Sequence, residues 1–488
     1  MMTDKKTWIA ILLLISVTAG FAGCTNEDDV NIDDNIKTKQ AAEVSEPVPE
    51  TEENDSKPEE EHDDETDEPD IKSNLAEIRE QIYDREEQVN KLDTNNDGYL
   101  TSDEYNGTQK LFEDMDLDGD NRLNADETEY MMTFENIPTG SFIMGTDDPI
   151  VAFDEEQLAS SPAHPVTIDG FQMASTELTT AQYCLYLNSA MEADQIKVEL
   201  APLTDIQKAR MIYPVDTYEV RGAAGTTYQG ELFMQLVKVS TISHEYNENG
   251  PLLVPDHPLN ECWIYYVPDT ERFYVDPGFE NWPAAYLKFY GAMAFAEYYG
   301  LSLPTEAEWE YVGSGGRQFE FPTDDGTNDG DKSNYACFNV ENDEDFDGAD
   351  EPENFVGFRL DVGKYPANPY GLYDLAGNVW EWTLDWYDEN FFQYCVINGI
   401  TRNPLNIDGH EDPPVDTVES AIEEGVTGGP GQEFSHGSRV CKGGSYNYHE
   451  AMTYTTLRFP VYYYIANDHF GARYVIRSSD VEFNGKVK

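Results

Sequence analysis

The most informative stretch of this sequence runs from Asn368 to Trp382 and reads NPYGLYDLAGNVWEW. Its last three residues place two indole side chains on either side of one carboxylate, Glu381. A carboxylate between two large apolar rings is expected to be buried, and a buried charge must be compensated by a metal ion or by hydrogen bonds. We therefore expect this stretch to lie in the core of a folded domain.

The sequence on both sides of this stretch is typical of a large domain with many short strands. Between residues 135 and 480, β-rich and aromatic stretches are broken by Gly, Pro and Asn, and the chain's 31 Tyr, 23 Phe and 7 Trp are ample for a sizeable core. Two segments have the pattern of helices, Thr179–Ala193 and Ala284–Tyr299. Residues 191–280 are poorly patterned, and we expect insertions and hairpins there.

Several ordered blocks in this domain resemble the formylglycine-generating enzyme, or sulfatase-modifying-factor, family. Besides the stretch quoted above, the blocks are Ile137–Gly145, His164–Phe171, Thr176–Tyr183, Phe279–Pro283, Leu303–Tyr311, Arg439–Ser445 and Gly471–Arg473. The resemblance implies an α+β fold, the C-type-lectin-like fold of formylglycine-generating enzymes, with much irregular structure. We assign this domain to residues 135–480.

The resemblance also implies structural calcium inside the large domain. Active members of the family hold the ion through side chains and backbone carbonyls around the motif that contains Glu381. Carried over by motif, the ligands are Asp374, the carbonyls of Gly377 and Val379, and Glu381. A second family site would begin at Asn334 and Tyr335, and its other ligands would fall in the acidic stretch 341–353. The alternative at both places is a carboxylate that hydrogen bonds alone hold in the core.

The catalytic cysteines of the family have no counterpart here. Family enzymes oxidise a substrate cysteine to formylglycine with two cysteines that bind copper, because thiolates suit a soft monovalent copper ion. The corresponding residues in this chain, three and eight positions after Ser445, are Tyr448 and Thr453. Cys441 is close in sequence but precedes the block, and we expect it to be a buried structural residue. We therefore expect no catalytic residues and no copper.

A segment rich in Tyr and polar residues follows instead of the cysteine pair. Tyr and Arg give contact energy at low entropic cost in recognition sites, and in the family fold this segment should line the former active-site groove. The candidate groove residues are Ser445, Tyr446, Tyr448, Arg458 and Arg473. The alternative is an ordinary aromatic core.

Two acidic loops precede the large domain and fit the EF-hand pattern. The first has ligand positions Asp93, Asn95, Asp97, Tyr99, Thr101 and Glu104. The second has ligand positions Asp116, Asp118, Asp120, Arg122, Asn124 and Glu127. Calcium takes roughly six to eight oxygens, and the last glutamate closes the shell with both of its oxygens. We therefore expect calcium as cofactor, and acidic loops without metal are the alternative.

The second loop departs from the pattern at its sixth position, where Asn121 replaces glycine. Asparagine tolerates the left-handed conformation better than other residues, so we expect weakened rather than abolished binding. The eighth residue of each loop is apolar, which allows the loops to pair through a short β-bridge. We expect a small all-α EF-hand pair over residues 71–134, with helices over Ile71–Leu92 and Tyr105–Met115.

The N-terminus resembles that of a bacterial lipoprotein. Lys5 and Lys6 precede an apolar run that is too short to span a bilayer and that ends in Ala22-Gly23-Cys24. We expect residues 1–23 to be a signal peptide and Cys24 to carry lipid, with an ordinary secretory signal as the alternative. Residues 24–70 are acidic and lack aromatic side chains, which favours a disordered tether. We expect an outer-membrane lipoprotein, facing either the periplasm or the cell surface.

The formal net charge of −66 makes nucleic acid a poor partner, because so negative a surface repels polyanions. We expect a membrane-anchored binding or scaffold protein whose partner is an envelope protein, a peptide or a glycan. The alternatives are an oxidoreductase of the formylglycine-generating type and another enzyme on the same fold. Disulfide pairing stays open among Cys184, Cys262, Cys337, Cys395 and Cys441.

Overall fold

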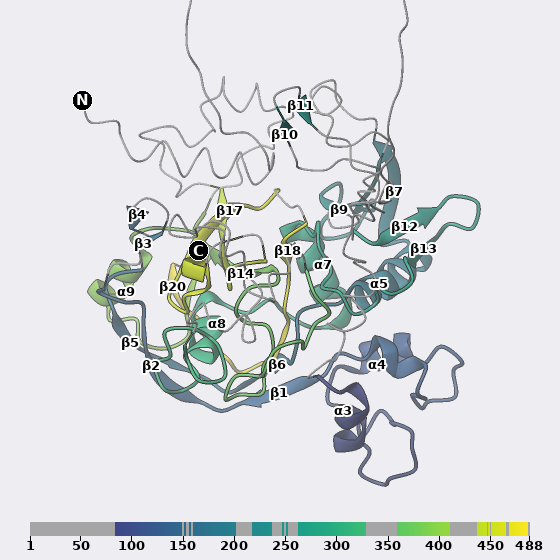
Figure 1. Ribbon diagram of the computed structural model, residues 1–488, viewed down its shortest axis with the longest axis horizontal. Coiled ribbons are helices and arrows are strands. Elements are labelled where there is room, and N and C mark those ends of the chain that lie inside the picture. Colours follow the sequence, from purple (N-terminus) through teal and green to yellow (C-terminus); the bar gives the residue numbers. More distant parts are fainter. Residues whose placement is uncertain are drawn as a thin grey trace, which may run out of the picture. The chain divides into compact units, whose positions relative to one another are not determined.

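The computed structural model describes much of the chain from Tyr83 onward (Figure 1). The described residues are 83–148, 151–152, 156–157, 160–201, 217–236, 246–247, 250–251, 262–327, 359–409, 437–446, 448, 450–464 and 468–486. The predicted signal peptide, Cys24 and the predicted tether lie outside them, as do Asn334, Tyr335 and Cys337. None of the helices within these ranges is long and apolar enough to cross a membrane.

The EF-hand region contains two short α-helices, α3 (Arg85–Leu92) and α4 (Gln109–Met115), and the 3₁₀ helix η1 (Glu127–Tyr130). Both α-helices differ from the prediction at their starts. The backbones of Asp84 and Thr108 are extended, and their side chains accept hydrogen bonds from the amides of the first turn. Of the helix predicted over Ile71–Leu92, the described residues contain the part from Arg85 onward, and residues 71–82 lie outside them. The helix predicted over Tyr105–Met115 begins only at Gln109.

Strand β1 (Phe134–Ile137) leads from the EF-hand region into the large domain. It pairs antiparallel with β6 (Phe171–Ala174), which also pairs with β19 (Val475–Arg477). The beginning and the end of the large domain therefore share one sheet. Next along the chain, β2 (Gly140–Met144) pairs with β5 (His164–Ile168).

A four-stranded sheet holds the motif around Glu381. Its strand order is β17 (Phe459–Tyr462), β16 (Ser438–Lys442), β14 (Trp380–Trp386) and β18 (Phe470–Gly471). Glu381 lies opposite Lys442 on one side and Gly471 on the other. Strand β14 is buried along nearly its whole length, and Glu381 itself is only 1% exposed. The prediction that this carboxylate is buried is confirmed.

The helices of the large domain are α5 (Thr180–Glu192), α7 (Phe289–Tyr299), α8 (Glu306–Gly313) and α9 (Phe391–Asn398), counted over the described residues. The helix predicted over Thr179–Ala193 is confirmed. The helix predicted over Ala284–Tyr299 begins five residues later, because Tyr286 has a positive φ of 60° and Lys288 is the N-cap. Helices α5 and α8 both start with a capping box, in which the N-cap threonine and the third helical residue bond reciprocally.

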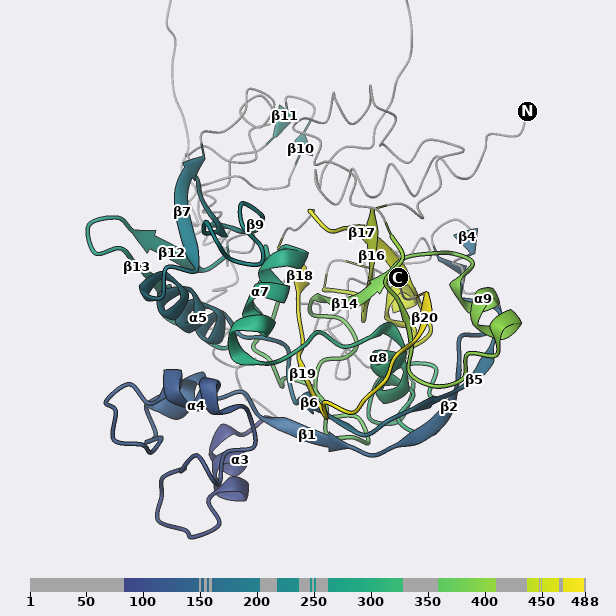
Figure 2. The ribbon, with the colours of Figure 1, turned by 180° about the vertical axis from the view of Figure 1, so that it is seen from behind.

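The segment between α5 and α7 forms small sheets, as predicted for residues 191–280 (Figure 2). Strands β7 (Ile196–Ala201), β8 (Thr217–Gly222) and β9 (Leu232–Leu236) form one antiparallel sheet, and β12 (Ile264–Val267) and β13 (Arg272–Val275) form a hairpin. Three further pairs are very short: β3 (Val151–Ala152) with β4 (Glu156–Gln157), β10 (Tyr246–Asn247) with β11 (Gly250–Pro251), and β15 (Pro404–Asn406) with β20 (Asn484–Lys486). A few helices with many small sheets confirm the α+β class.

The EF-hand region and the large domain share one core. Leu100 and Phe112 of the EF-hand region belong to the same apolar cluster as Phe295 on α7. Hydrogen bonds also join the EF-hand region to the large domain. The Tyr299 hydroxyl donates a hydrogen bond to the Asp114 carboxylate at 3.1 Å, and the Arg85 guanidinium donates one to the Asn281 side chain at 2.6 Å. The two regions therefore pack as one compact unit.

Candidate functional site

The first EF-hand loop is folded around its own acidic side chains. The amides of Asp97 and Gly98 donate to the Asp93 carboxylate at 3.3 and 2.9 Å, and the Tyr99 amide donates to Asp97 at 3.0 Å. The turn needs left-handed backbone at two residues, Asn96 with φ 57° and Gly98 with φ 83°. These bonds gather the predicted ligand residues of the loop's first half.

Glu104 closes this loop from the other end. Its carboxylate accepts hydrogen bonds from the amides and the hydroxyls of Thr94 and Thr101, at 2.8 to 3.1 Å. The bonds from Thr101 are the largest cause that lowers the pKa of Glu104, to about 2. The carboxylate is therefore charged and aimed across the loop, as a twelfth-position ligand must be.

The second loop brings its first three acidic residues together. One carboxylate oxygen each of Asp116, Asp118 and Asp120 lies within 4.8 Å of the other two. The left-handed residues are Gly119, with φ 74°, and Asn121, with φ 62°. Asn121 thus adopts the conformation expected of it. Compared with the first loop, asparagine and glycine have exchanged places at the two turning positions.

The two loops are joined at their eighth residues. Leu100 and Leu123 form the expected β-bridge, with N–O distances of 3.1 and 2.7 Å, and both side chains are buried. At the seventh position, where the backbone carbonyl is the expected ligand, the side chains point to each other: the Arg122 guanidinium lies 5.7 Å from the centre of the Tyr99 ring. Each loop therefore supports the conformation of the other.

In the large domain, Glu381 forms a fully buried ion pair with Arg473. Two guanidinium nitrogens donate to Glu381 Oε1 at 2.8 and 3.0 Å, and the Trp309 indole donates to Oε2 at 2.8 Å. The same guanidinium donates to two backbone carbonyls, of Ala174 and Tyr373. Hydrogen bonds therefore compensate the buried charge of Glu381. The sequence left this possibility open as the alternative to a metal ion.

Two further carboxylates lie close to this pair. Glu177 accepts hydrogen bonds from the Asn378 side chain at 2.7 Å and from the Val379 amide at 3.2 Å, and Asp374 accepts one from the Gly363 amide. Burial raises the pKa of Glu177 well above its ordinary value, and the neighbouring Asp374 adds to this. Burial also raises the pKa of Asp374, to about 6. Sequence analysis gave Glu177 no role, and its only signal was its place within the Thr176–Tyr183 block.

This cluster fits a calcium-type cation. The described residues place the buried carboxyl groups of Glu177, Asp374 and Glu381 near the guanidinium of Arg473, so a cation that displaced their protons would find more carboxylates than Arg473 alone balances. Calcium takes oxygen ligands, and this donor set supplies them. Asp374 and Glu381 would hold the ion together with the two predicted backbone carbonyls, and Glu177 is a further carboxylate at hand. The second family site, at Asn334 and Tyr335, lies outside the described residues.

Tyr448 and Thr453, the residues predicted to stand in place of the family's cysteines, are both buried. The Tyr448 ring packs edge-on against Trp380 at 5.5 Å and against His469 at 5.3 Å. Thr453 ends the 3₁₀ helix η3 (Glu450–Thr453), and its hydroxyl donates to the Glu450 carbonyl at 2.7 Å. A phenol and a hydroxyl are hard oxygen donors, which a soft metal binds less well than thiolates.

The four cysteines within the described residues, Cys184, Cys262, Cys395 and Cys441, are all buried. Cys441 lies on β16, opposite Trp382 and Phe459. Burial raises its pKa well above the ordinary value, so the thiol is protonated at neutral pH. Cys441 is thus the buried residue expected from the sequence.

The prediction of an open groove needs correction. Arg458 and Arg473 are fully buried, and Ser445, Tyr446 and Tyr448 are 0, 4 and 6% exposed. Each arginine is held by a buried glutamate, and the Tyr446 hydroxyl donates to the Asp468 carboxylate at 2.7 Å. The aromatic-core alternative therefore describes these residues better. Tyrosine and arginine in a sequence do not reveal whether their polar groups meet solvent or internal partners.

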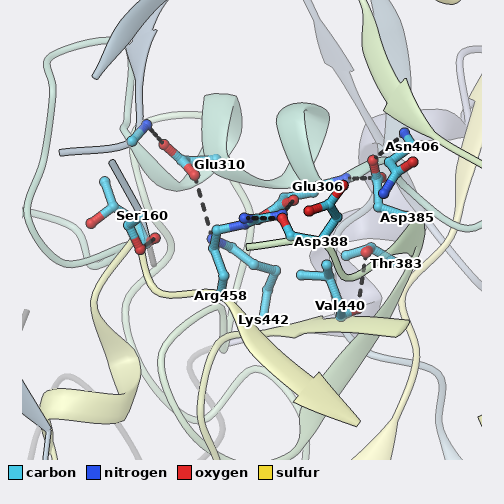
Figure 3. A network of polar contacts seen from close by, with 12 residues as sticks. Ser160, Glu306, Glu310, Thr383, Asp385, Asp388, Asn406, Val440, Lys442 and Arg458 are labelled. Atoms are coloured by element: carbon cyan, nitrogen blue, oxygen red, sulfur yellow. Dashed lines mark hydrogen bonds and ion pairs between the residues drawn. The ribbon is translucent and has the colours of Figure 1, made fainter. Parts of the chain in front are cut away.

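A second buried network, which the sequence did not indicate, surrounds Arg458 (Figure 3). Its guanidinium donates to both oxygens of Glu306, at 2.6 and 3.0 Å. Nearby, Lys442 Nζ lies 3.5 Å from Glu310, and Asp385 accepts hydrogen bonds from the amides of Glu306 and Asn406 at 2.7 and 2.9 Å. These groups join α8 to β14, β16 and β17, so the network ties a helix to the four-stranded sheet.

The comparisons with known proteins agree with this fold. The family described as "Sulfatase-modifying factor enzyme 1-like domain" matches residues 121–478, and the EF hand matches residues 90–106 and 108–132. The formylglycine-generating enzyme of Mus musculus is 30% identical over 330 residues, which cover 65% of this chain and 67% of that protein. A serine/threonine-protein kinase pkn1 of Chlamydia pneumoniae is 37% identical over 123 residues, which cover 25% of this chain and 17% of the kinase.

Among solved structures, PvdO from Pseudomonas aeruginosa is similar, with 18% identity and a TM-score of 0.38 over 71% of this chain and 94% of that one. The family match spans well over half of the chain and includes the blocks around Glu381 and Tyr448. The chain therefore belongs to the sulfatase-modifying factor enzyme 1-like family and carries an EF-hand pair at its N-terminal side.

Proposed function

We propose that this chain is a lipid-anchored, calcium-binding protein whose large domain acts as a binding or scaffold module at the cell envelope and does not form formylglycine. The proposal depends above all on Tyr448 and Thr453, which stand where the resemblance to the family places its copper-binding cysteines. Both side chains offer only hard oxygen donors, whereas monovalent copper prefers sulfur.

The surroundings of these two residues support a structural role. Tyr448 fills its place with ring contacts, and the Thr453 hydroxyl is already bonded to a backbone carbonyl. The nearest thiol in sequence, Cys441, is fully buried between the neighbouring strands β14 and β17. Copper coordination by Cys441 would require a rearrangement of the packed four-stranded sheet.

Calcium has a structural task in this proposal. The EF-hand loops belong to a region whose apolar side chains share a core with α5 and α7, so a rigid loop pair supports the large domain. Binding free energy at such sites adds to folding free energy. The module would then present a fixed surface to an envelope protein, a peptide or a glycan.

Copper binding and turnover separate this proposal from the oxidoreductase alternative. The calcium-loaded full chain is titrated with Cu(I) against a chromophoric chelator and is then incubated with a Cys-x-Pro-x-Arg peptide. We expect no tight copper binding and no conversion of the peptide cysteine. The matched control is the double variant Tyr448→Cys, Thr453→Cys, which restores two thiols and should compete for copper. Tight binding or turnover by the native chain would overturn the proposal.

The anchor is tested in cells. We propose that Cys24 carries lipid and holds the chain at the outer membrane. An alkyne fatty acid fed to the producing bacterium should label the native chain and not a Cys24→Ser variant. The labelled chain should fractionate with outer membranes. Equal labelling of both chains, or a native chain recovered in the soluble fraction, would refute the anchor without affecting the copper result.

A further inference from the structure

A pocket of about 200 Å³ opens on the large domain beside α7, away from the positions of the cysteine pair. Helices α5 and α7, the turn between β8 and β9, and strand β9 supply its walls. The residues that carry the argument are Tyr186, Thr227, Tyr228, Phe233, Glu297 and Tyr298. Such a volume exceeds that of a single water molecule and suits one small organic group.

Aromatic rings form the floor and the sides of this pocket. Tyr186 and Phe233 are fully buried at the floor, whereas Tyr228 and Tyr298 are only partly buried. The rings are steeply inclined to one another: Tyr186 and Tyr298 meet at 69° with centres 5.5 Å apart, and Tyr228 and Phe233 meet at 75° with centres 6.4 Å apart. These edge-to-face contacts hold the four rings that line the pocket in fixed orientations.

One carboxylate, that of Glu297, lies at the solvent side. The Thr227 hydroxyl donates a hydrogen bond to the Glu297 carboxylate at 2.6 Å. Burial, and then the charge of Glu297, raises the pKa of the neighbouring Tyr228 phenol. Within the described part of the chain, no ion pair neutralises Glu297. The pocket therefore combines aromatic walls with a fixed negative charge.

The Tyr298 ring already shows that it attracts a cation. Lys110 Nζ, from α4, lies 4.8 Å from the centre of this ring. The charge of Lys110 is balanced by Asp114 at 2.5 Å, so it does not offset Glu297. Lys110 does not line the pocket, which leaves the pocket itself open to a ligand.

We propose that this pocket binds a quaternary ammonium group of the trimethylammonium type. Aromatic faces attract such cations by their quadrupole, and desolvation strengthens the attraction. The Thr227 hydroxyl already bonds to one oxygen of Glu297, and the carboxylate supplies a negative charge beside the rings, which suits a cation bound through its charge and its apolar surface. The net charge of −66 also raises the local concentration of cations around the protein. This site does not depend on the proposed function, because it holds whether or not the large domain is catalytic.

The test is a calorimetric titration of the calcium-loaded full chain with choline. The matched probe is 3,3-dimethyl-1-butanol, which has the shape of choline without the charge. We expect saturable choline binding and no binding of the alcohol. Loss of discrimination between the two, or no saturation by choline up to tens of millimolar, would overturn the proposal.

Variants of the pocket residues test whether choline binds at this pocket. Glu297→Gln and Tyr298→Leu should each weaken choline binding about fivefold or more, whereas Glu192→Gln, an exposed acid on α5, should leave it unchanged. Thermal unfolding of each variant shows whether it is folded. Native affinity in both pocket variants would place the choline elsewhere and refute the site. Phosphocholine and a trimethyl-lysine peptide, titrated separately, then distinguish a lipid headgroup from a modified protein as the source of the group.

Discussion

At the scale of single residues, the large domain is organised by buried charges with named partners. Arg458 with Glu306, and Arg473 with Glu381, are fully buried ion pairs. Burying one charge alone would cost several kcal/mol, so neither partner is dispensable. Sequence analysis found Glu381 from the two indoles beside it. The pairing with Arg473 could not be seen in the sequence, because 92 residues separate the two and the pairing of β14 with β18 brings Arg473 close to Glu381.

Truncation of Arg458 tests the strength of such a pair. Arg458→Met leaves the Glu306 carboxylate buried without its cation, and the free energy of unfolding should fall by about 3–5 kcal/mol. The double variant Arg458→Met, Glu306→Leu removes both charges and should recover most of that loss. Urea denaturation measures both. A single variant that loses less than about 1 kcal/mol would mean that solvent reaches Glu306.

Asp385 in the same network should make stability depend on pH. Burial, and then the charge of Glu306, raises the pKa of Asp385 to about 7, while Arg458 opposes the shift. An unfolded aspartate titrates near ~3.9, so between about pH 4 and 7 the folded state holds a proton that the unfolded state has lost. Stability should therefore fall as pH rises through this window, by an amount on the order of a few kcal/mol. Asp385→Asn should flatten the slope in urea melts at pH 5 and 8, and an unchanged slope would exclude Asp385 as its source.

At the scale of elements, the sequence predicts features that depend on neighbouring residues, but it does not predict features that depend on contacts between distant parts of the chain. The EF-hand loops, helix α5 and the buried strand β14 could be predicted, because ligand spacing and apolar patterns lie within a few residues of each other. The starts of α4 and α7 could not, because they depend on the extended backbone of Thr108 and the left-handed Tyr286. The groove prediction failed for a related reason: burial of Arg458 is decided by α8, an element far away in sequence.

The second EF-hand loop allows a sharp test of backbone strain. Asn121 adopts a left-handed φ of 62° at the sixth position, where glycine has no steric cost. Asn121→Gly should tighten calcium binding at this loop, by up to about fivefold, or about 1 kcal/mol. Asn96→Gly, at the other turning position of the first loop, is the matched variant and should act on the first site alone. Calcium titrations followed by calorimetry separate the two sites, and weaker binding in Asn121→Gly would contradict the strain argument.

At the scale of the whole molecule, the EF-hand pair and the large domain behave as one packed body. Leu123 of the second loop and Tyr474 near the C-terminal end lie in the same apolar cluster, and the 3₁₀ helix η1 is followed almost at once by β1. Such continuity means that the calcium-binding loops cannot open without disturbing the packing on α5 and α7. Calcium should therefore stabilise residues that never touch it.

Tryptophan fluorescence can measure this effect, because apart from Trp8 every tryptophan lies in the large domain, at residues 263, 282, 309, 380, 382 and 386. Removing calcium with a chelator should lower the fluorescence-detected melting temperature by several degrees, since a ligand at about 1,000 times its Kd contributes about 4 kcal/mol per site. The double variant Glu104→Gln, Glu127→Gln loses the closing ligand of each EF-hand loop and should lose most of this shift. Any part that remains would report calcium bound outside the EF-hand loops, as at the Glu381 cluster. A full calcium shift in the double variant would show that the loops do not support the large domain, and the shared core would then transmit nothing from one to the other.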